Sequence, residues 1–198
     1  MLPADRIAGL CDLTTGSIAG CPVIPRRLSE VRDAFADQHA CDALLRSADP
    51  VIYTVSTFDV GGGPGELQCG LGVLFPGRVG DEYYLTRGHL HARRETPEVY
   101  VGLQGKGLML LQGEDGGSMT ADLVENGFVY VPGHSAHRTV NTGTGPLIYL
   151  GIYPADAGHD YDSIRAENFR TVVVARHGTP AVLPRREYLN RFAHPRTP

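Results

Sequence analysis

The chain has 198 residues, which is enough for one domain with its own hydrophobic core and a short appendage. Its net charge of −4 and 42% hydrophobic content are typical of a soluble globular protein. No basic block could follow a phosphate backbone and no apolar run could span a bilayer, so we expect no nucleic-acid partner and no membrane insertion. The first six residues lack the charged and apolar segments of a signal peptide. We therefore expect a cytoplasmic protein whose four cysteines are free thiols.

Residues 1–49 are predicted to form an N-terminal arm with two helical segments that pack on the rest of the chain. Ser29 is a candidate N-cap for a short helix through Phe35, because its hydroxyl can accept hydrogen bonds from free amides. A second helix is expected from His39 to Ala48, and the Asp49-Pro50 pair would end it.

From Pro50 onward the sequence predicts short strands separated by Gly and Pro. The expected strands are 51–58, 67–75, 82–85, 98–103, 108–112, 119–123, 128–131, 138–141 and 147–153. Strands this short, at intervals of about ten residues with turn residues between them, favour an all-β sandwich or barrel.

Two glycine-rich segments are interpreted as turns. The run at residues 61–65 is expected to be a hairpin loop and not a phosphate-binding loop, because no helix start follows it. Gly105-Lys106-Gly107 is predicted to be a tight turn that closes a hairpin. The tail at 184–198, rich in Arg and Pro, is expected to pack loosely or to be disordered. The predicted layout is an arm at 1–49, one barrel at 50–183 and this tail.

The segment Gly88-His89-Leu90-His91 points to a chemical function. Two histidines at positions i and i+2 of an extended segment face the same side. A nearby carboxylate, Glu95 or Glu98, and a third imidazole, His137, would complete a set of nitrogen and oxygen ligands. Such a set suits zinc, iron, manganese or nickel. The alternatives are that the pair is a chance occurrence on a solvated strand and that His137 is a core histidine.

The spacing around the two histidines argues against chance. A glutamate follows within seven residues, Gly105 follows it, and Pro132 precedes His137. This is the two-part signature of a cupin, a small double-sheet β-barrel with a metal in its mouth. His134 lies in the turn before His137 and is expected to be solvated.

Pro97 favours Glu98 over Glu95 as the ligand. Proline is tolerated at the first position of a strand and poorly inside one, so the strand is expected to begin at Pro97 or Glu98. Alternation along the strand then places Glu98, Tyr100 and Gly102 on one face. Glu95 would lie in the preceding turn, where the direction of a side chain is less fixed.

Four segments of the chain carry a family resemblance. They are residues 50–55, 74–107, 129–141 and 153–161, and they contain TRGHLH, AHRTVN and YPADAGHDY in this order. With them the sequence resembles the cupin-type phosphoglucose isomerases, the metal-dependent glucose-6-phosphate isomerases of archaea and some bacteria. The resemblance implies a double-stranded β-helix, also called a jelly-roll barrel, and a cytosolic homodimer that interconverts glucose 6-phosphate and fructose 6-phosphate.

The resemblance also assigns roles to residues. It implies one divalent transition metal per subunit, with Fe²⁺ favoured and Zn²⁺, Mn²⁺ or Ni²⁺ as alternatives. The implied metal ligands are His89, His91, Glu98 and His137. The implied catalytic residues are Glu98, His137 and Tyr153, and Glu98 is ligand, general base or both. The implied substrate-binding residues are Tyr53, Thr86, Gly88, Tyr100, Tyr153, His159 and Tyr161.

Taken singly, each tyrosine is better interpreted as a half-buried barrel residue. The segment that follows Pro154 differs, because it is too polar for a core and too long for a tight turn. Gly72 departs from the family pattern, in which a Thr lines the sugar site. This departure bears on one substrate hydrogen bond and not on the reaction class.

Two other functions are compatible with a cupin barrel. A non-haem iron dioxygenase would use the same three histidines and one carboxylate, but it would not need a polar phosphate pocket. A non-catalytic sugar-binding cupin would keep the barrel and could lose a metal ligand, whereas all four ligand positions are filled here.

Overall fold

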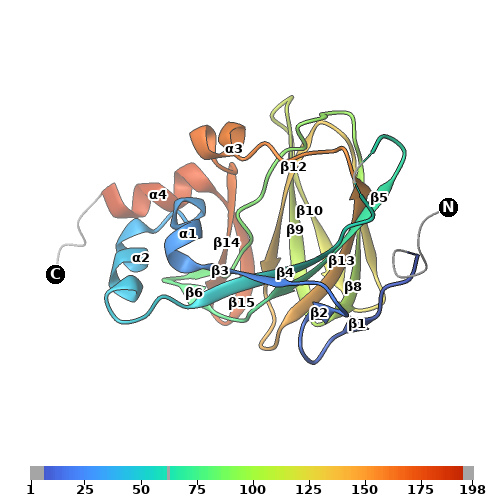
Figure 1. The fold of residues 1–198 in the computed structure, drawn as a ribbon. Coiled ribbons are helices and arrows are strands. Elements are labelled where there is room, and N and C mark those ends of the chain that lie inside the picture. Colours follow the sequence, from blue (N-terminus) through green and yellow to red (C-terminus); the bar gives the residue numbers. More distant parts are fainter. Residues whose placement is uncertain (1–6, 62, 194–198) are drawn as a thin grey trace.

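Two antiparallel sheets face each other and form the barrel (Figure 1). The computed structural model describes residues 7–61 and 63–193. The larger sheet has the strand order β11-β8-β13-β5-β4-β3 and the smaller one β10-β9-β12. The strands of the larger sheet are β3 (Val23–Arg27), β4 (Val51–Phe58), β5 (Leu67–Leu74), β8 (Glu98–Gln104), β11 (Phe128–Val131) and β13 (Leu147–Pro154). Those of the smaller sheet are β9 (Lys106–Gly113), β10 (Ser118–Val124) and β12 (Ser135–Asn141).

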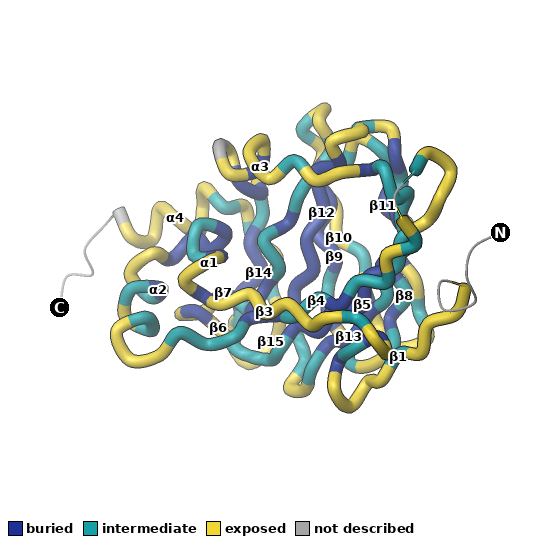
Figure 2. The backbone as a smooth tube through the Cα atoms, viewed as in Figure 1, coloured by how far each residue is buried: buried dark blue, intermediate teal, exposed yellow. Residues whose placement is uncertain are grey.

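This arrangement is the double-stranded β-helix that the sequence predicts. All nine expected strands between residues 51 and 153 are present, with some ends shifted by a few residues. Apolar residues that face inward from both sheets form one core cluster, which includes Leu74, Met109, Leu123 and Leu147. Buried residues are concentrated in the barrel strands, whereas the residues of the loops and of the N-terminal segment are mostly exposed (Figure 2).

Gly105 connects the two sheets and does not close a hairpin. β8 pairs with β11 and β13, and β9 pairs with β10 and β12, so the predicted hairpin at Gly105–Gly107 is wrong. Gly105 has a φ of +80°, and a Cβ there would lie 2.4 Å from the carbonyl oxygen of Pro146. Glycine is therefore required, because the chain must turn in the left-handed region while it passes close to another backbone.

The N-terminal arm contributes helices and one barrel strand. A hairpin of β1 (Cys11–Asp12) and β2 (Ser17–Ile18) precedes β3, which pairs with β4 at the edge of the larger sheet. After β3 come α1 (Leu28–Val31), a 3₁₀ turn at Arg32–Ala34 and α2 (Gln38–Leu45). Ser29 is not the N-cap, because α1 begins one residue earlier and Ser29 instead donates to the Asp49 carboxylate through its amide and hydroxyl.

A third sheet and a C-terminal helix cover the end of the barrel next to α2 (Figure 1). This sheet consists of β6 (Arg78–Val79), β7 (Glu82–Tyr83), β14 (Thr171–Arg176) and β15 (Thr179–Pro184). Helix α3 (Asp162–Glu167) precedes β14, and helix α4 (Arg185–Ala193) follows β15.

The loosely packed tail expected from residue 184 is wrong for residues 185–193. They form α4, whose Tyr188 is 1% exposed and packs with Ala36, Val172 and Val174. Residues 194–198 lie outside the described residues. Within the part of the chain that the structure describes, no helix is long and apolar enough to cross a membrane.

Candidate functional site

The backbone places His89 and His137 opposite each other. The two residues form an antiparallel bridge, in which His89 N donates to His137 O at 3.2 Å and His137 N donates to His89 O at 3.0 Å. The segment before β8 approaches β12 closely because residue 88 is glycine, with a φ of +77°. A Cβ there would lie 2.7 Å from the Phe169 ring and 2.9 Å from His137 O.

Glu98 is the first residue of β8, and its side chain points into the barrel. Residues Glu98, Tyr100 and Gly102 are buried, and the residues between them are less so, as the alternation predicts. Room for the carboxylate comes from Gly151 on β13, where a Cβ would lie 2.7 Å from Glu98 Oε1. Glu95 has a 65% exposed side chain that pairs with Arg93, so it lies outside the site.

Four potential metal ligands converge in the barrel. One donor atom from each of His89, His91, Glu98 and His137 lies within 4.8 Å of all the others. Glu98 Oε2 is 3.3 Å from His91 Nε2 and 3.0 Å from His137 Nε2. The sequence prediction therefore names a set of residues that the structure brings together.

The imidazoles present their Nε2 atoms to the common centre. His91 Nδ1 contacts Thr96 O at 2.9 Å and His137 Nδ1 contacts Ser135 O at 3.2 Å. A carbonyl partner on Nδ1 fixes the proton there and leaves the Nε2 lone pair free, which is the arrangement of metal-binding histidines. Among the described residues the buried Nε2 atom of His89 has no hydrogen-bond partner, and the buried Nε2 atom of His137 lies 3.0 Å from the Glu98 carboxylate. A buried nitrogen without a partner, beside a carboxylate, fits a bound cation.

The charge of the cluster also fits a cation. Burial alone would raise the pKa of Glu98, but hydrogen bonds from His137 and His91 and their charge lower it to about 2. Burial, with the neighbouring histidines, lowers the pKa of His89 well below its usual value. Burial would lower the pKa of His91, but hydrogen bonds with Glu98 and Thr96 and the charge of Glu98 raise it. A metal binds the ionised carboxylate and neutral imidazoles, so its binding would release any proton that the cluster holds.

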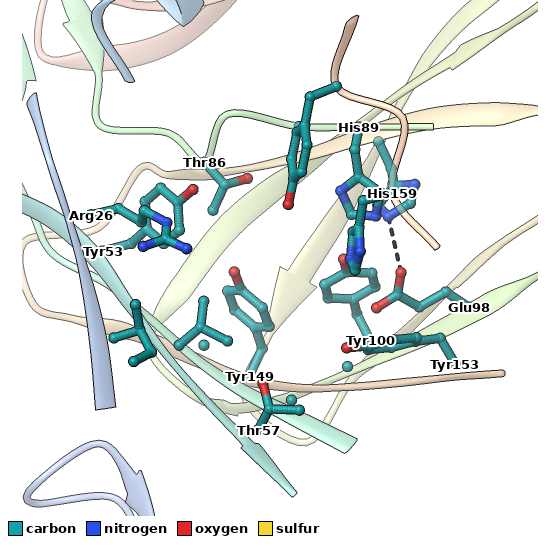
Figure 3. A pocket seen from close by; sticks show the side chains of 18 residues that line it. Arg26, Tyr53, Thr57, Thr86, His89, Glu98, Tyr100, Tyr149, Tyr153 and His159 are labelled. Atoms are coloured by element: carbon teal, nitrogen blue, oxygen red, sulfur yellow. Dashed lines mark ion pairs between the residues drawn. The ribbon is translucent and has the colours of Figure 1, made fainter. Parts of the chain in front are cut away.

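A cavity of about 270 Å³ opens above the four ligands. Its size lies near the lower end for small-molecule sites, roughly 300–1,000 Å³. Ten of the predicted site residues line it, and the eleventh, His91, contacts Glu98 at 3.3 Å. The ten are Tyr53, Thr86, Gly88, His89, Glu98, Tyr100, His137, Tyr153, His159 and Tyr161. Figure 3 shows His89 and Glu98 on one side of the cavity and Tyr53 with Thr86 on the other.

The polar segment after Pro154 forms one wall of the cavity. Leu90 and Asp160 form a backbone bridge, and Asp160 pairs with Arg94, which holds the segment beside the histidines. As a result the His159 ring lies 4.4 Å from the His89 ring and stacks on Tyr161 with an interplanar angle of 5°. Burial lowers the pKa of His159, so its ring is neutral near pH 7.

Sequence reasoning missed three polar residues that line the cavity: Arg26, Thr57 and Tyr149. Arg26 lies on β3 directly opposite Tyr53 of β4, so both side chains face the cavity. The signal for it was weak, because the extended Val23–Arg27 segment precedes a helix and reads as part of the arm. Of the described residues that line the cavity, Arg26 alone carries a permanent positive charge.

A double-sheet barrel with a cluster of three histidines and one glutamate in its mouth defines the protein as a cupin. Comparison with known sequences assigns it more closely. The family model "Glucose-6-phosphate isomerase (GPI)" matches residues 25–188.

Several relatives cover most of the chain. A protein named glucose-6-phosphate isomerase from Thermococcus kodakarensis is 44% identical over 87% of this chain and 90% of its own. Another with that name, from Thermococcus gammatolerans, is 46% identical over 84% of this chain and 88% of its own. A protein from Rhizobium meliloti named putative glucose-6-phosphate isomerase 2 is 39% identical over 83% and 85%. The chain therefore belongs to the glucose-6-phosphate isomerase family, in its cupin form.

Among solved structures, a mutant oxalate decarboxylase from Bacillus subtilis is similar to 59% of this chain and 30% of its own, at 23% identity and a TM-score of 0.45. A likeness at this level identifies no function for the chain.

Proposed function

We propose that the protein interconverts glucose 6-phosphate and fructose 6-phosphate at one divalent metal bound by His89, His91, Glu98 and His137. The observation that carries this proposal is the convergence of three imidazoles and one ionised carboxylate at the floor of a small polar cavity, in a chain of the glucose-6-phosphate isomerase family.

The donor set suits a first-row transition metal. Imidazole and carboxylate ligands accept Fe²⁺, Mn²⁺, Ni²⁺ and Zn²⁺, and we favour Fe²⁺. When bound, such an ion would polarise the carbonyl and the neighbouring hydroxyl oxygen of the open-chain sugar.

The protein's own groups would manage the proton transfers. The isomerisation moves a hydrogen between C1 and C2 while the two oxygens exchange protons. Glu98 is ionised near pH 7 because its pKa is about 2 and can serve as ligand, base or both. Burial, followed by the charge of Glu98, raises the pKa of Tyr153 to about 12, so its hydroxyl stays protonated and can donate. His137 Nε2 lies 3.0 Å from the Glu98 carboxylate and would hold its orientation.

The far side of the cavity from the ligand cluster would bind the phosphate. Thr86 lies there, and the Gly88 backbone, His159 and Tyr161 offer further polar groups closer to the ligand cluster, where the His159 ring is 4.4 Å from the His89 ring. Tyr53 and Tyr100 would line the sugar. A phosphate dianion also needs charge compensation. Arg26 supplies it, because its guanidinium is the permanent cation of the lining residues.

The proposal includes a homodimer in the cytoplasm. β11 is the edge strand of the larger sheet, and its Phe128 and Tyr130 are 73% and 56% exposed. An exposed edge strand with aromatic side chains is a surface that a second copy can cover. A cytoplasmic location follows from the proposed substrates, since charged sugar phosphates are retained inside cells.

A coupled assay tests the activity directly. Purified, metal-loaded protein is expected to produce glucose 6-phosphate from fructose 6-phosphate and the reverse, with saturation, and to leave unphosphorylated fructose unchanged. Absence of product in both directions from metal-loaded protein contradicts the proposal. Oxygen uptake during turnover would favour a dioxygenase instead, and sugar-phosphate binding without turnover would favour a sugar-binding cupin.

A further inference from the structure

The side chain of Tyr149 fills the space in the cavity wall that is left free by the missing side chain of Gly72. They are directly opposite each other in the register of β13 and β5, and both line the cavity. A Cβ on residue 72 would lie 2.4 Å from Tyr149 Cζ and 2.7 Å from its hydroxyl oxygen. The Tyr149 ring therefore fills the space that a side chain at position 72 would take, and it can do so only because residue 72 is glycine.

The Tyr149 hydroxyl is held in place from the opposite sheet. Thr139 Oγ1 on β12 lies 3.2 Å from it and 3.2 Å from Thr86 Oγ1, and the amide of Thr139 donates to Thr86 Oγ1 at 3.1 Å. The hydroxyl is thus tied to a residue predicted to bind substrate. Figure 3 shows it pointing into the cavity, between Tyr53 and Thr86 on one side and Tyr100 and Glu98 on the other.

The Tyr149 hydroxyl keeps hydrogen-bonding capacity for a ligand. Thr139 Oγ1 has one proton for its contacts with Tyr149 and Thr86, so Tyr149 either accepts from Thr139 or donates to it. Burial raises the pKa of Tyr149 far above neutrality, so its hydroxyl is protonated at pH 7. In the first case its proton, and in the second a lone pair, is left for a substrate hydroxyl in the cavity. A buried hydroxyl with unused capacity costs free energy unless a ligand meets it.

We propose that Tyr149 is a specificity-determining residue whose hydroxyl hydrogen-bonds a hydroxyl group in the middle of the sugar chain, at C3 or C4, and that Gly72 is required to place it. This inference rests on the proposed function. It assigns the central part of the cavity to a polar contact with the sugar, between the metal end and the phosphate end.

Deoxy analogues of the substrate test the contact. Dissociation constants of glucose 6-phosphate and of its 3-deoxy and 4-deoxy analogues are measured by calorimetry for wild type and Tyr149→Phe. A site that hydrogen-bonds a substrate hydroxyl rejects the analogue that lacks it. Wild type should therefore bind one analogue roughly tenfold or more weakly than glucose 6-phosphate, a factor typical of one lost hydrogen bond. Tyr149→Phe should bind that analogue and glucose 6-phosphate with similar affinity.

Gly72→Ala tests the placement of the ring without removing the hydroxyl. Its methyl group would displace the ring, so discrimination against the same analogue should fall as it does in Tyr149→Phe. The matched control is Gly70→Ala, two residues along the same strand, where a Cβ meets nothing closer than 3.9 Å, the distance to Tyr153 Cε1. It should weaken discrimination far less than Gly72→Ala.

The outcomes separate this inference from the proposed function. If wild type is an active isomerase and Tyr149→Phe weakens all three ligands equally, or none of them, the inference is overturned and the activity stands. If wild type has no isomerase activity, the proposed function falls first. Melting temperatures identify a variant that fails to fold. If either Tyr149→Phe or Gly72→Ala fails to fold, the discrimination measured with the other variant tests the inference.

Discussion

Replacing Glu98 with Gln tests the most constrained group of the site. The side chain is 4% exposed, and its Oε2 lies 3.0 and 3.3 Å from two imidazole nitrogens. Gln keeps the size and removes the charge, so the barrel should fold. Turnover should fall by about 10²–10⁴, the range for a positioned acid–base group, which corresponds to about 3–5 kcal/mol of barrier. The coupled assay measures turnover, and elemental analysis of the same sample measures metal content.

The metal content separates the two roles of Glu98. If Glu98 is mainly a ligand, metal falls in parallel with turnover, and if it is mainly the base, metal stays bound while turnover is lost. Glu95→Gln is the matched control, because Glu95 is three residues away, exposed and paired with Arg93. It should leave both quantities nearly unchanged. Loss of metal in Glu95→Gln, with an active Glu98→Gln, would refute the assignment.

Three further predictions concern the phosphate, the C-terminal helix and the assembly. Arg26→Gln should raise the KM for fructose 6-phosphate and the inhibition constant of inorganic phosphate about tenfold, since a charge-assisted hydrogen bond is lost. The control is Arg27→Gln, which should change neither constant, because the Arg27 side chain bonds Asp49 O at 2.8 Å. Equal effects of the two substitutions would argue against Arg26 as the phosphate partner. Tyr188→Ala should lower the free energy of unfolding in urea by about 3–5 kcal/mol, because it empties the core under α4; an unchanged midpoint would mean that α4 is not packed there. Light scattering should give twice the 21.3 kDa of one chain, and a monomer mass at micromolar concentration would remove the dimer and leave the barrel.

The barrel strands and the ligand cluster could be predicted because each depends on local rules. The alternation of side chains and the turn residues predict the nine strands. Pro97 indicates where β8 begins, and alternation from that point predicts that Glu98 points into the barrel. His-x-His places two imidazoles on one side by the same rule. These features need only a few neighbouring residues to be understood.

The missed features depend on contacts between distant parts of the chain. β3 is a strand because it pairs with β4, and that pairing aims Arg26 into the cavity although the segment reads as part of a helical arm. The hairpin at Gly105 was wrong because local sequence cannot show which sheet the next strand joins. Helix α4 is ordered by the burial of Tyr188, which the Arg- and Pro-rich composition of the tail conceals.

The pairing of Gly72 with Tyr149 shows the same limit at the site. Gly72 by itself suggests one hydrogen bond fewer to the sugar. The register of β5 and β13 shows that the Tyr149 ring occupies the space of a side chain at position 72, and this register was not accessible from either segment alone.

Metal removal and restoration test the central claim most directly. Exhaustive chelation, checked by elemental analysis, should abolish interconversion of glucose 6-phosphate and fructose 6-phosphate while the circular dichroism spectrum keeps its β-rich form. Fe²⁺, Mn²⁺, Ni²⁺ or Zn²⁺ should restore activity to differing degrees, with full recovery at one metal per chain. Full isomerase activity in protein shown to be free of metal would contradict the account.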